Sequence, residues 1–354
     1  LLSDESVAGS LHLEGHNGMF AMKLHEHPKY EGTHRARKSY FFFDDRVIVL
    51  GSNIENDNQD YHTETTLYQS HLFVENDPTW MGTVDSCAML DELHDERTSH
   101  AESGGSVWLM DNNANGYFIP EGQTVSFSRK LQHSKHQQDG SDTEGLFASA
   151  WIEHGKAPKQ AAYEYAMLIH TEIEAIQEFT RKMADPQTAP YLVLRKDKNV
   201  HIVKDRAART IGYAFFEAGL LERDRFIANV DTPSMVMIRE EMTGEVIHLS
   251  AVDPDLRLYQ GLEDDQYDEQ GIQQEVSVYS RKWIHAQSEM KRMTISLRGY
   301  WQAENVDIID DSQNQEAQTR ITNIQHNDGQ TIIEIDAVHA MPVQVTLQQV
   351  DVGG

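Results

Sequence analysis

The sequence predicts an all-β protein made of antiparallel β-sandwiches, with one short amphipathic helix near residues 171–184. Many short runs of aromatic and β-branched residues are separated by polar, turn-forming residues, which is typical of strands in sandwiches. Near the C-terminus, Ile333, Ile335 and Ala337 alternate with polar residues, as in a strand with one buried face. Many strands with one isolated helix favour packed sheets over an α/β fold.

The segment 38–54 contains one of the strongest strand signals in the sequence. Residues 40–43 and 47–50 are apolar runs that flank the polar residues Asp44 and Asp45. An Asp-Asp pair between two such runs favours a turn, so the segment predicts a β-hairpin. Because the runs are apolar on both faces, we expect strands covered on both sides rather than a one-sided surface sheet.

The same patterns predict further strands on either side of this hairpin. Two short strands are expected within 11–24, and others at 64–74, 107–110, 117–119, 124–128, 148–152, 162–169, 191–194, 200–203, 212–216, 234–238, 246–252, 333–337 and 343–347. Polar, Gly-containing or acidic composition predicts loops at 94–105, 132–144 and 262–275.

The one predicted helix follows the strand expected at 162–169. Thr171 is placed to cap it, and Glu174 would complete a capping box. Pro186 would stop it. The apolar face consists of Ile173, Ile176, Phe179 and Met183. We expect this face to pack on the sheet of its own domain, with docking onto another part of the protein as the alternative.

The length of 354 residues predicts two domains, 1–188 and 189–354. The chain begins at Leu1 without Met or a leader sequence, so we expect a segment of a longer protein. No run approaches the roughly 20 apolar residues of a membrane helix. The net charge of −27 argues against a nucleic-acid partner, because such proteins need a basic surface. Cys87 is the only cysteine, which excludes an internal disulfide and leaves the compartment open; no base motif marks it as a nucleophile.

Three histidine and acidic residues have a spacing that suits a metal. His12, Glu14 and His16 would lie on one face of a strand and present two imidazoles and a carboxylate to zinc. A chain with 18 histidines produces such spacings by chance, so a plain surface strand is the competing interpretation. The same two interpretations apply to His25 and His27.

Two other features are candidate binding sites. Residues 111–116 are rich in Asp and Asn before a Gly, as in a calcium loop, but the bidentate Glu of an EF-hand is absent, which favours a turn. Basic residues cluster locally and would form a polyanion site if they shared one wall, although a structural or solvated role is the favoured interpretation for any one of them. These residues are Arg35, Arg37, Lys38, Arg129, Lys130, Arg195, Lys196 and Lys198.

Several segments resemble polysaccharide lyase family eight, whose members act on hyaluronan, chondroitin sulfates and xanthan. The similarity begins with Lys38-Ser-Tyr-Phe-Phe-Phe-Asp44, Leu50-Gly-Ser-Asn-Ile54 and Glu64-Thr-Thr-Leu-Tyr-Gln69. It continues through Val125-Ser-Phe-Ser-Arg129, Ser149-Ala-Trp-Ile-Glu-His154, Val193-Leu-Arg-Lys-Asp-Lys-Asn-Val-His201 and Leu249-Ser-Ala-Val-Asp-Pro-Asp-Leu256, which look most like chondroitinase ABC-type members. It is least clear across 259–292 and in the last strands.

The resemblance implies a supersandwich domain, incomplete at its N-terminus, followed by a smaller C-terminal β-sandwich. It also implies a secreted or periplasmic glycosaminoglycan lyase acting by β-elimination. The family's Asn or Glu, His, Tyr and Arg lie in an upstream helical toroid and at the start of the sheet domain, and a calcium ion of some relatives also binds upstream. We therefore assign no catalytic, cofactor or metal residue here, Glu14 included. We expect this segment to line the cleft, support the toroid and be inactive alone. The competing interpretation is a free-standing carbohydrate-binding or structural sandwich.

Overall fold

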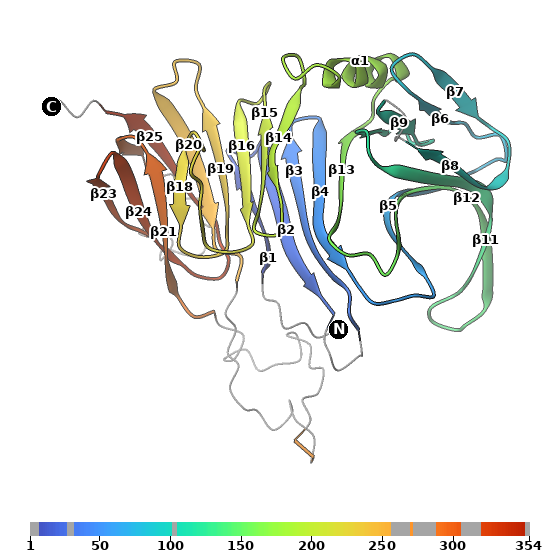
Figure 1. Cartoon of the computed structure of the whole chain (residues 1–354), viewed down its shortest axis with the longest axis horizontal. Coiled ribbons are helices and arrows are strands. Elements are labelled where there is room, and N and C mark those ends of the chain that lie inside the picture. Colours follow the sequence, from blue (N-terminus) through green and yellow to red (C-terminus); the bar gives the residue numbers. More distant parts are fainter. Residues whose placement is uncertain are drawn as a thin grey trace. The chain divides into compact units, whose positions relative to one another are not determined.

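The computed structural model describes residues 7–26, 32–100, 105–255, 270–271, 288–305 and 320–350. Throughout these residues the chain is antiparallel β-structure apart from one helix (Figure 1), so the predicted fold class is confirmed. None of the described helical structure is long and apolar enough to cross a membrane. The loop predicted at 262–275 lies, apart from 270–271, outside the described residues.

The contacts within the chain divide it into two compact units. Unit 1 contains residues 1–41 and 193–354, and unit 2 contains residues 42–192. The first 41 residues therefore group with the C-terminal part of the chain, although more than a hundred residues separate the two in sequence. The domain boundary expected between residues 188 and 189 stays a prediction.

Unit 2 contains two antiparallel sheets and the helix. Its strands are β4 (Arg46–Glu55), β5 (His62–His71), β6 (Thr79–Gly82), β7 (Cys87–Leu90), β8 (His94–His100), β9 (Val107–Met110), β10 (Gly116–Ile119), β11 (Thr124–Lys135), β12 (Asp142–Lys156) and β13 (Ala161–Leu168), and its helix is α1 (Ile173–Met183). The strand orders are β4-β13-β10-β9-β6-β7 and β5-β12-β11-β8.

The hairpin expected around Asp44 and Asp45 is present. β3 (Arg35–Phe43) ends and β4 begins on either side of these two residues, and Asp44 adopts a φ of 47° in the turn. β4 is buried along almost its whole length, as its two-faced apolar sequence predicts. β3 is buried at alternate positions toward its end, so the expectation of burial on both faces holds for the second strand of the hairpin only.

Helix α1 packs on the sheet of its own unit, as expected. Ile176 and Phe179 are buried, and the ring centres of Phe179 and Phe118 lie 5.6 Å apart. The predicted capping box is wrong. The N-cap residue is Glu172 and makes no side-chain cap hydrogen bond. The backbone N–H of Thr171 instead donates to Ala114 O at 2.7 Å, which holds Thr171 outside the first turn.

Two of the predicted loops, 94–105 and 132–144, contain strand residues. Residues 94–100 form β8, which pairs with β11. Residues 132–135 and 142–144 belong to a long β11–β12 hairpin that stays paired out to Lys135 opposite Asp142. The paired ends of β11 and β12 are exposed and polar, so backbone pairing rather than burial of apolar side chains holds this part of the hairpin together. A hydrophobicity pattern carries no signal for such strands.

Unit 1 contains the remaining strands. Besides β3 they are β1 (Ala8–Leu13), β2 (Asn17–His25), β14 (Tyr191–Lys196), β15 (Val200–Asp205), β16 (Thr210–Phe215), β17 (Gly219–Leu220), β18 (Ile227–Val230), β19 (Ser234–Glu240), β20 (Val246–Val252), β21 (Lys291–Arg298), β22 (Trp301–Asn305), β23 (Ile321–Asn327), β24 (Gln330–Ala337) and β25 (Val343–Gln349). They form the series β1-β2-β3, a seven-stranded sheet β14-β15-β16-β19-β20-β25-β22 and a five-stranded sheet β17-β18-β21-β24-β23.

The core of unit 1 lies between the seven- and five-stranded sheets, which confirms the expected C-terminal sandwich. Tyr213 and Leu249 from the first sheet share one buried cluster with Ile295 and Ile333 from the second. β1 and β2 contact β19 and β20. Gly212 of β16 allows Phe41 of β3 to pack closely on this strand, since a Cβ at Gly212 would lie 2.5 Å from the ring of Phe41.

Candidate functional site

The structure does not form the strand face on which the zinc hypothesis depends. β1 ends at Leu13, and Glu14, with a φ of 52°, begins the turn to β2. The carboxylate of Glu14 accepts two hydrogen bonds from the guanidinium of Arg239, one of them 2.8 Å long. His248 Nδ1 lies 3.3 Å from the same carboxylate. The hydrogen bond from Arg239 is the main reason why the pKa of Glu14 is lowered, against the effect of partial burial.

Glu14 is thus a structural ion-pair partner that joins the β1–β2 turn to β19 and β20. Its backbone N–H also donates to Gln344 Oε1 of β25 at 3.0 Å, and His12 Nδ1 lies 3.4 Å from the amide nitrogen of that residue. Over the described residues, no group of three or more His, Cys, Asp or Glu side chains is placed to hold a metal ion. His25 lies at the end of β2, and His27 lies outside the described residues.

The segment 111–116 is the turn expected as the alternative to a calcium loop. Asp111 Oδ1 accepts the backbone N–H groups of Asn113 and Asn115, each at 2.9 Å. Asp111 Oδ2 accepts the hydroxyl of Tyr117 at 3.2 Å. The buried carboxylate therefore organises the turn with both of its oxygens. Burial of the ring and, second, the negative charge of Asp111 raise the pKa of Tyr117, so this phenol remains a proton donor.

Arg129, one of the proposed polyanion residues, is a buried structural residue. Its guanidinium donates to Thr79 Oγ1 at 3.0 Å and to the carbonyl oxygens of Glu75 and Asp77 at 3.1 and 2.7 Å. These bonds fix the segment that leads into β6. Burial lowers the pKa of Arg129, but a guanidinium remains charged at any ordinary pH.

Three further members of the basic clusters are engaged or partly buried. Arg195 pairs with Asp197. The guanidinium carbon of Arg37 lies 6.0 Å from the ring centre of Phe216. Burial lowers the pKa of Lys38. Cys87 is exposed on β7, and its pKa is raised, first by desolvation and then by Glu174, which disfavours the reactive thiolate.

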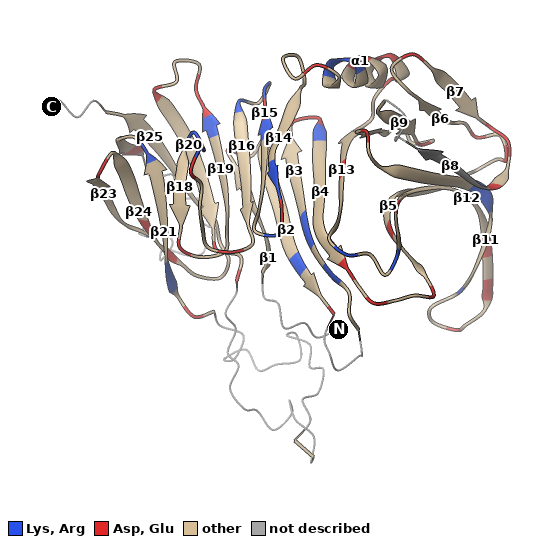
Figure 2. Cartoon of the chain, in the orientation of Figure 1, with Lys and Arg blue, Asp and Glu red and all other residues tan. Residues whose placement is uncertain are grey.

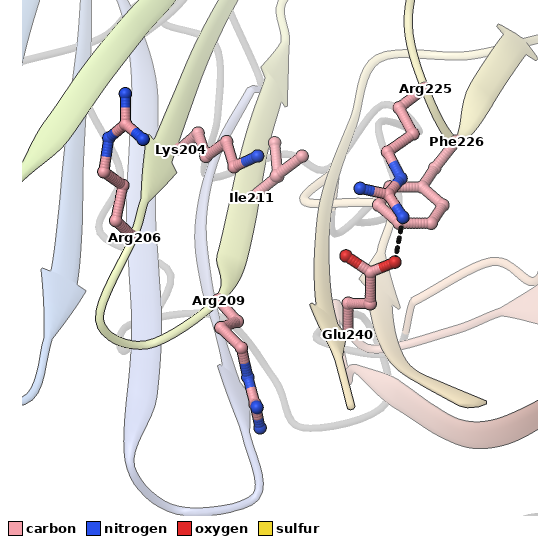
Figure 3. Close-up of a pocket in the computed structure, with 7 residues that line it drawn as sticks. All are labelled: Lys204, Arg206, Arg209, Ile211, Arg225, Phe226 and Glu240. Carbon is pink, nitrogen blue, oxygen red and sulfur yellow. Dashed lines mark hydrogen bonds and ion pairs between the residues drawn. The ribbon is translucent and has the colours of Figure 1, made fainter. Parts of the chain in front are cut away.

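Four basic residues that the sequence interpretation missed line a pocket of about 200 Å³ in unit 1 (Figure 3). They are Lys204, Arg206, Arg209 and Arg225, and Ile211, Phe226 and Glu240 complete the lining. Figure 2 shows basic residues at the turn between β15 and β16, where the first of them lie. The signal for three of them was Lys204-x-Arg206-x-x-Arg209. Arg225 comes from a different loop, which only the fold brings close.

The β15–β16 turn presents these side chains in a fixed way. The turn comprises residues 206–209, and the buried Asp205 accepts the backbone N–H of Ala208 at 2.8 Å. Thr210 Oγ1 donates to Ala208 O at 2.8 Å, and Arg209 has a φ of 49°. Lys204 lies opposite Ile211 in the strand register, so both side chains face the same pocket.

Arg225 reaches the pocket from the loop before β18. Its guanidinium carbon lies 5.0 Å from the ring centre of Phe226, and it donates a hydrogen bond to Glu240. The loop is held by Asp224, whose Oδ1 accepts the hydroxyl of the buried Tyr213 at 2.9 Å and the backbone N–H groups of Phe226 and Ile227. The arrangement places several cationic groups around one small cavity and can bind an anion.

Comparisons with known proteins agree with the fold and with the sequence resemblance. Residues 2–180 match the model described as polysaccharide lyase family 8, super-sandwich domain. The chain is 42% identical over 304 residues to chondroitin sulfate ABC exolyase of Proteus vulgaris, and the match covers 85% of this chain and 28% of that protein. It is 40% identical over 309 residues to the chondroitin sulfate ABC exolyase of Bacteroides thetaiotaomicron, covering 85% and 27% of the two chains.

Solved structures extend the likeness over the whole chain. A Paenibacillus xanthan lyase superimposes with a TM-score of 0.73 at 18% identity and covers 100% of this chain, which in turn covers 30% of the xanthan lyase. A chondroitin AC lyase of Streptomyces coelicolor A3 gives a TM-score of 0.65 at 15% identity and covers 98% of this chain. At these identities the structures show the fold alone. The chain spans 28% and 27% of the two curated relatives and 30% and 37% of the two solved structures. With half of its residues in the family match, the chain belongs to polysaccharide lyase family 8 and corresponds to a C-terminal portion of such an enzyme.

Proposed function

We propose that this chain is the C-terminal β-sheet part of a glycosaminoglycan lyase that cleaves uronic-acid-containing polysaccharides. The substrates would be chondroitin or dermatan sulfate and hyaluronan. The observation that carries the proposal is the pair of relatives at 42% and 40% identity, both named chondroitin sulfate ABC exolyases, together with the family match. A relative at 26% identity is named a hyaluronate lyase, which supports the wider substrate class.

The reaction is a β-elimination at the bond to the uronic acid. One group neutralises the uronate carboxylate, a base removes the C5 proton, and an acid protonates the leaving oxygen. These groups belong to the part of the enzyme upstream of this chain. The buried phenols of the chain have structural tasks that support this division. Tyr191 donates to Glu164 at 3.0 Å and Tyr213 donates to Asp224. Burial is the main reason why the pKa of each is raised well above 10.

The role of this segment is then to line the substrate cleft and to support the upstream toroid. Its partners are that toroid and the anionic polysaccharide. A polymeric substrate of this kind is met outside the cytoplasm, which supports a secreted or periplasmic enzyme. The large all-β scaffold, in which the buried Arg129 and Asp111 hydrogen-bond neighbouring strands and turns, suits a supporting role.

The test compares this chain alone, the upstream part alone, and an equimolar mixture of the two. Unsaturated uronate absorbance is followed with chondroitin sulfate, dermatan sulfate and hyaluronan as substrates. We expect activity in the mixture and none with this chain alone. Cleavage by the isolated chain would overturn the division of labour. Tight, saturable glycan binding by the isolated chain, with no effect on the activity of the upstream part, would favour a free-standing binding module.

A further inference from the structure

We propose that the pocket formed by Lys204, Arg209 and Arg225 binds a sulfate or carboxylate group of an acidic polysaccharide. This inference rests on the proposed function for the identity of the ligand. It adds a location in this chain at which such a ligand is held. The pocket lies in the C-terminal sandwich of unit 1, and every residue that lines it belongs to that unit.

The first argument is charge. The lining contains four basic residues, Lys204, Arg206, Arg209 and Arg225, against the single carboxylate of Glu240, so the local formal charge is 4 − 1 = +3. The whole chain carries −27. A polyanion is therefore repelled by most of the surface and attracted at this pocket. Local fields of this kind determine where charged ligands accumulate.

The second argument is that two cations are available to a ligand. In the described part of the chain, neither Lys204 nor Arg209 has an ion-pair partner. Glu240, the one acidic group in the lining, is bound to Arg225 instead. In Figure 3 Lys204 points toward the side from which Arg225 reaches in, whereas Arg206 lies farther out and Arg209 points away from both Lys204 and Arg225 at the end of the turn. Cationic side chains of this kind gain most from an anionic ligand, because no internal contact has to be broken first.

The third argument is preorganisation. Arg225 is held between the ring of Phe226 and the carboxylate of Glu240. Asp205 and Thr210 fix the turn that carries Arg209 through hydrogen bonds to Ala208. Donors that are already in place lose less conformational entropy when they bind. A planar guanidinium also matches the two oxygens of a carboxylate or sulfate.

The fourth argument concerns the shape of the ligand. The cavity of about 200 Å³ accommodates an acidic group together with part of the sugar ring that carries it. Ile211 and Phe226 contribute apolar surface to the same lining. A pyranose ring presents C–H groups beside its charged substituents, so the mixture of cations and apolar carbon fits an acidic sugar. An acidic peptide is the competing ligand.

The test measures the affinity of the full 354-residue chain for chondroitin sulfate and hyaluronan oligosaccharides of equal length by isothermal titration calorimetry. The test variant is Lys204→Gln/Arg209→Gln. The control is Lys135→Gln/Lys182→Gln, which removes two exposed cations of unit 2 and changes the net charge equally. We expect Kd to rise about tenfold in the test variant, because charged hydrogen bonds are lost, and less than twofold in the control. Thermal melting verifies that both variants fold.

Further probes identify the group that is bound. Competition by inorganic sulfate and stronger binding of chondroitin sulfate than of hyaluronan would assign the site to sulfate, and equal binding would assign it to the uronate carboxylate. Equal Kd values for both variants would overturn the proposal. So would binding of poly-glutamate as tight as that of chondroitin sulfate, which would indicate an acidic peptide. Lyase activity of the reconstituted mixture is measured separately. If the mixture is inactive while the pocket variant still loses affinity, the proposed function fails and the binding site stands.

Discussion

The hydroxyl of Ser39 lies 2.7 Å from Nδ1 of His201, and both side chains are fully buried. The ring of His201 also packs edge-on against that of Phe216, with 4.9 Å between the two ring centres. Burial is the main reason why the pKa of His201 falls to about 3. Lys196 and Arg37 lower it further, whereas Asp197 acts in the opposite direction. His201 is therefore a neutral core residue that links β3 to β15.

This neutral histidine predicts a loss of stability in acid. The unfolded chain binds a proton at His201 below about pH 6.5, whereas the folded chain binds it only below about pH 3. Between these values the folded state loses up to about 1.4 kcal/mol per pH unit relative to a variant without the histidine. Urea unfolding of wild type and His201→Asn between about pH 7 and about pH 4 measures this difference in the free energy of unfolding. Most of this pH range lies between the unfolded and folded pKa values of His201. The exposed His133→Asn is the control, and parallel pH profiles for wild type and His201→Asn would contradict the prediction.

The Arg129→Lys substitution tests whether Arg129 is structural. Lysine cannot reach Thr79 Oγ1 and the carbonyl oxygens of Glu75 and Asp77 at once, and it leaves buried acceptors without donors. We expect a loss of about 3 kcal/mol in the free energy of unfolding. Lys130→Gln, its neighbour on β11, should change stability by less than about 0.5 kcal/mol. If Arg129→Lys leaves stability intact but weakens polyanion binding, Arg129 belongs to a binding surface instead.

The attachment of α1 to its sheet depends on Phe179. Its ring contacts Phe118 at 5.6 Å and stacks on Tyr191 at 6.3 Å. Phe179→Ala should cost about 3–5 kcal/mol, because it removes a buried ring and leaves a cavity. Met183→Ala, at a half-buried residue in the last turn of the helix, should cost much less. Thermal denaturation compares the two variants, and equal costs would show that the helix is not anchored at Phe179.

The loop that carries Arg225 should loosen when Tyr213 loses its hydroxyl. Tyr213→Phe removes one donor to Asp224, which still accepts two backbone N–H groups of the loop. We expect about 1 kcal/mol of destabilisation and a rise of a few-fold in the Kd for chondroitin sulfate, because one of three hydrogen bonds is lost. Tyr61→Phe, at a residue that is 74% exposed, is the matched control. Unchanged Kd in Tyr213→Phe would show that the loop position does not depend on this contact.

Strands with strong apolar patterns could be predicted from the sequence. The four residues of β9 are all buried, and the expected strand at 107–110 coincides with it. The helix was located for the same reason, since its apolar residues recur with helical period. The polar hairpin beyond Gln132 and the strand β8 could not be found this way, because their polar sequences show no apolar alternation although their backbones pair.

The site residues show a similar limit. The spacing of His12, Glu14 and His16 suggests a shared face only while the strand continues, and the tight turn at Glu14 ends it. The partner of Glu14 is Arg239, 225 positions away in the sequence, which no local pattern indicates. The basic pocket likewise combines a compact motif at 204–209 with Arg225 from another loop. Contacts between residues this far apart in the sequence depend on the order of strands in the sheets, which no local pattern reveals.

The division of unit 1 into residues 1–41 and 193–354 has a consequence for how the protein folds. Glu14 N–H finds its acceptor on Gln344, 330 positions later, so the unit cannot close until nearly the whole chain has left the ribosome. Unit 2 is continuous, and its contacts become available earlier. Closing contacts between distant positions is slow, because a long chain must first lose its freedom. Until β19 and β20 are synthesised, β1 and β2 cannot pack against them and remain exposed. Exposed strands are prone to aggregate. Early chain termination before β25 should therefore be more damaging to solubility than an equally short deletion inside a surface turn.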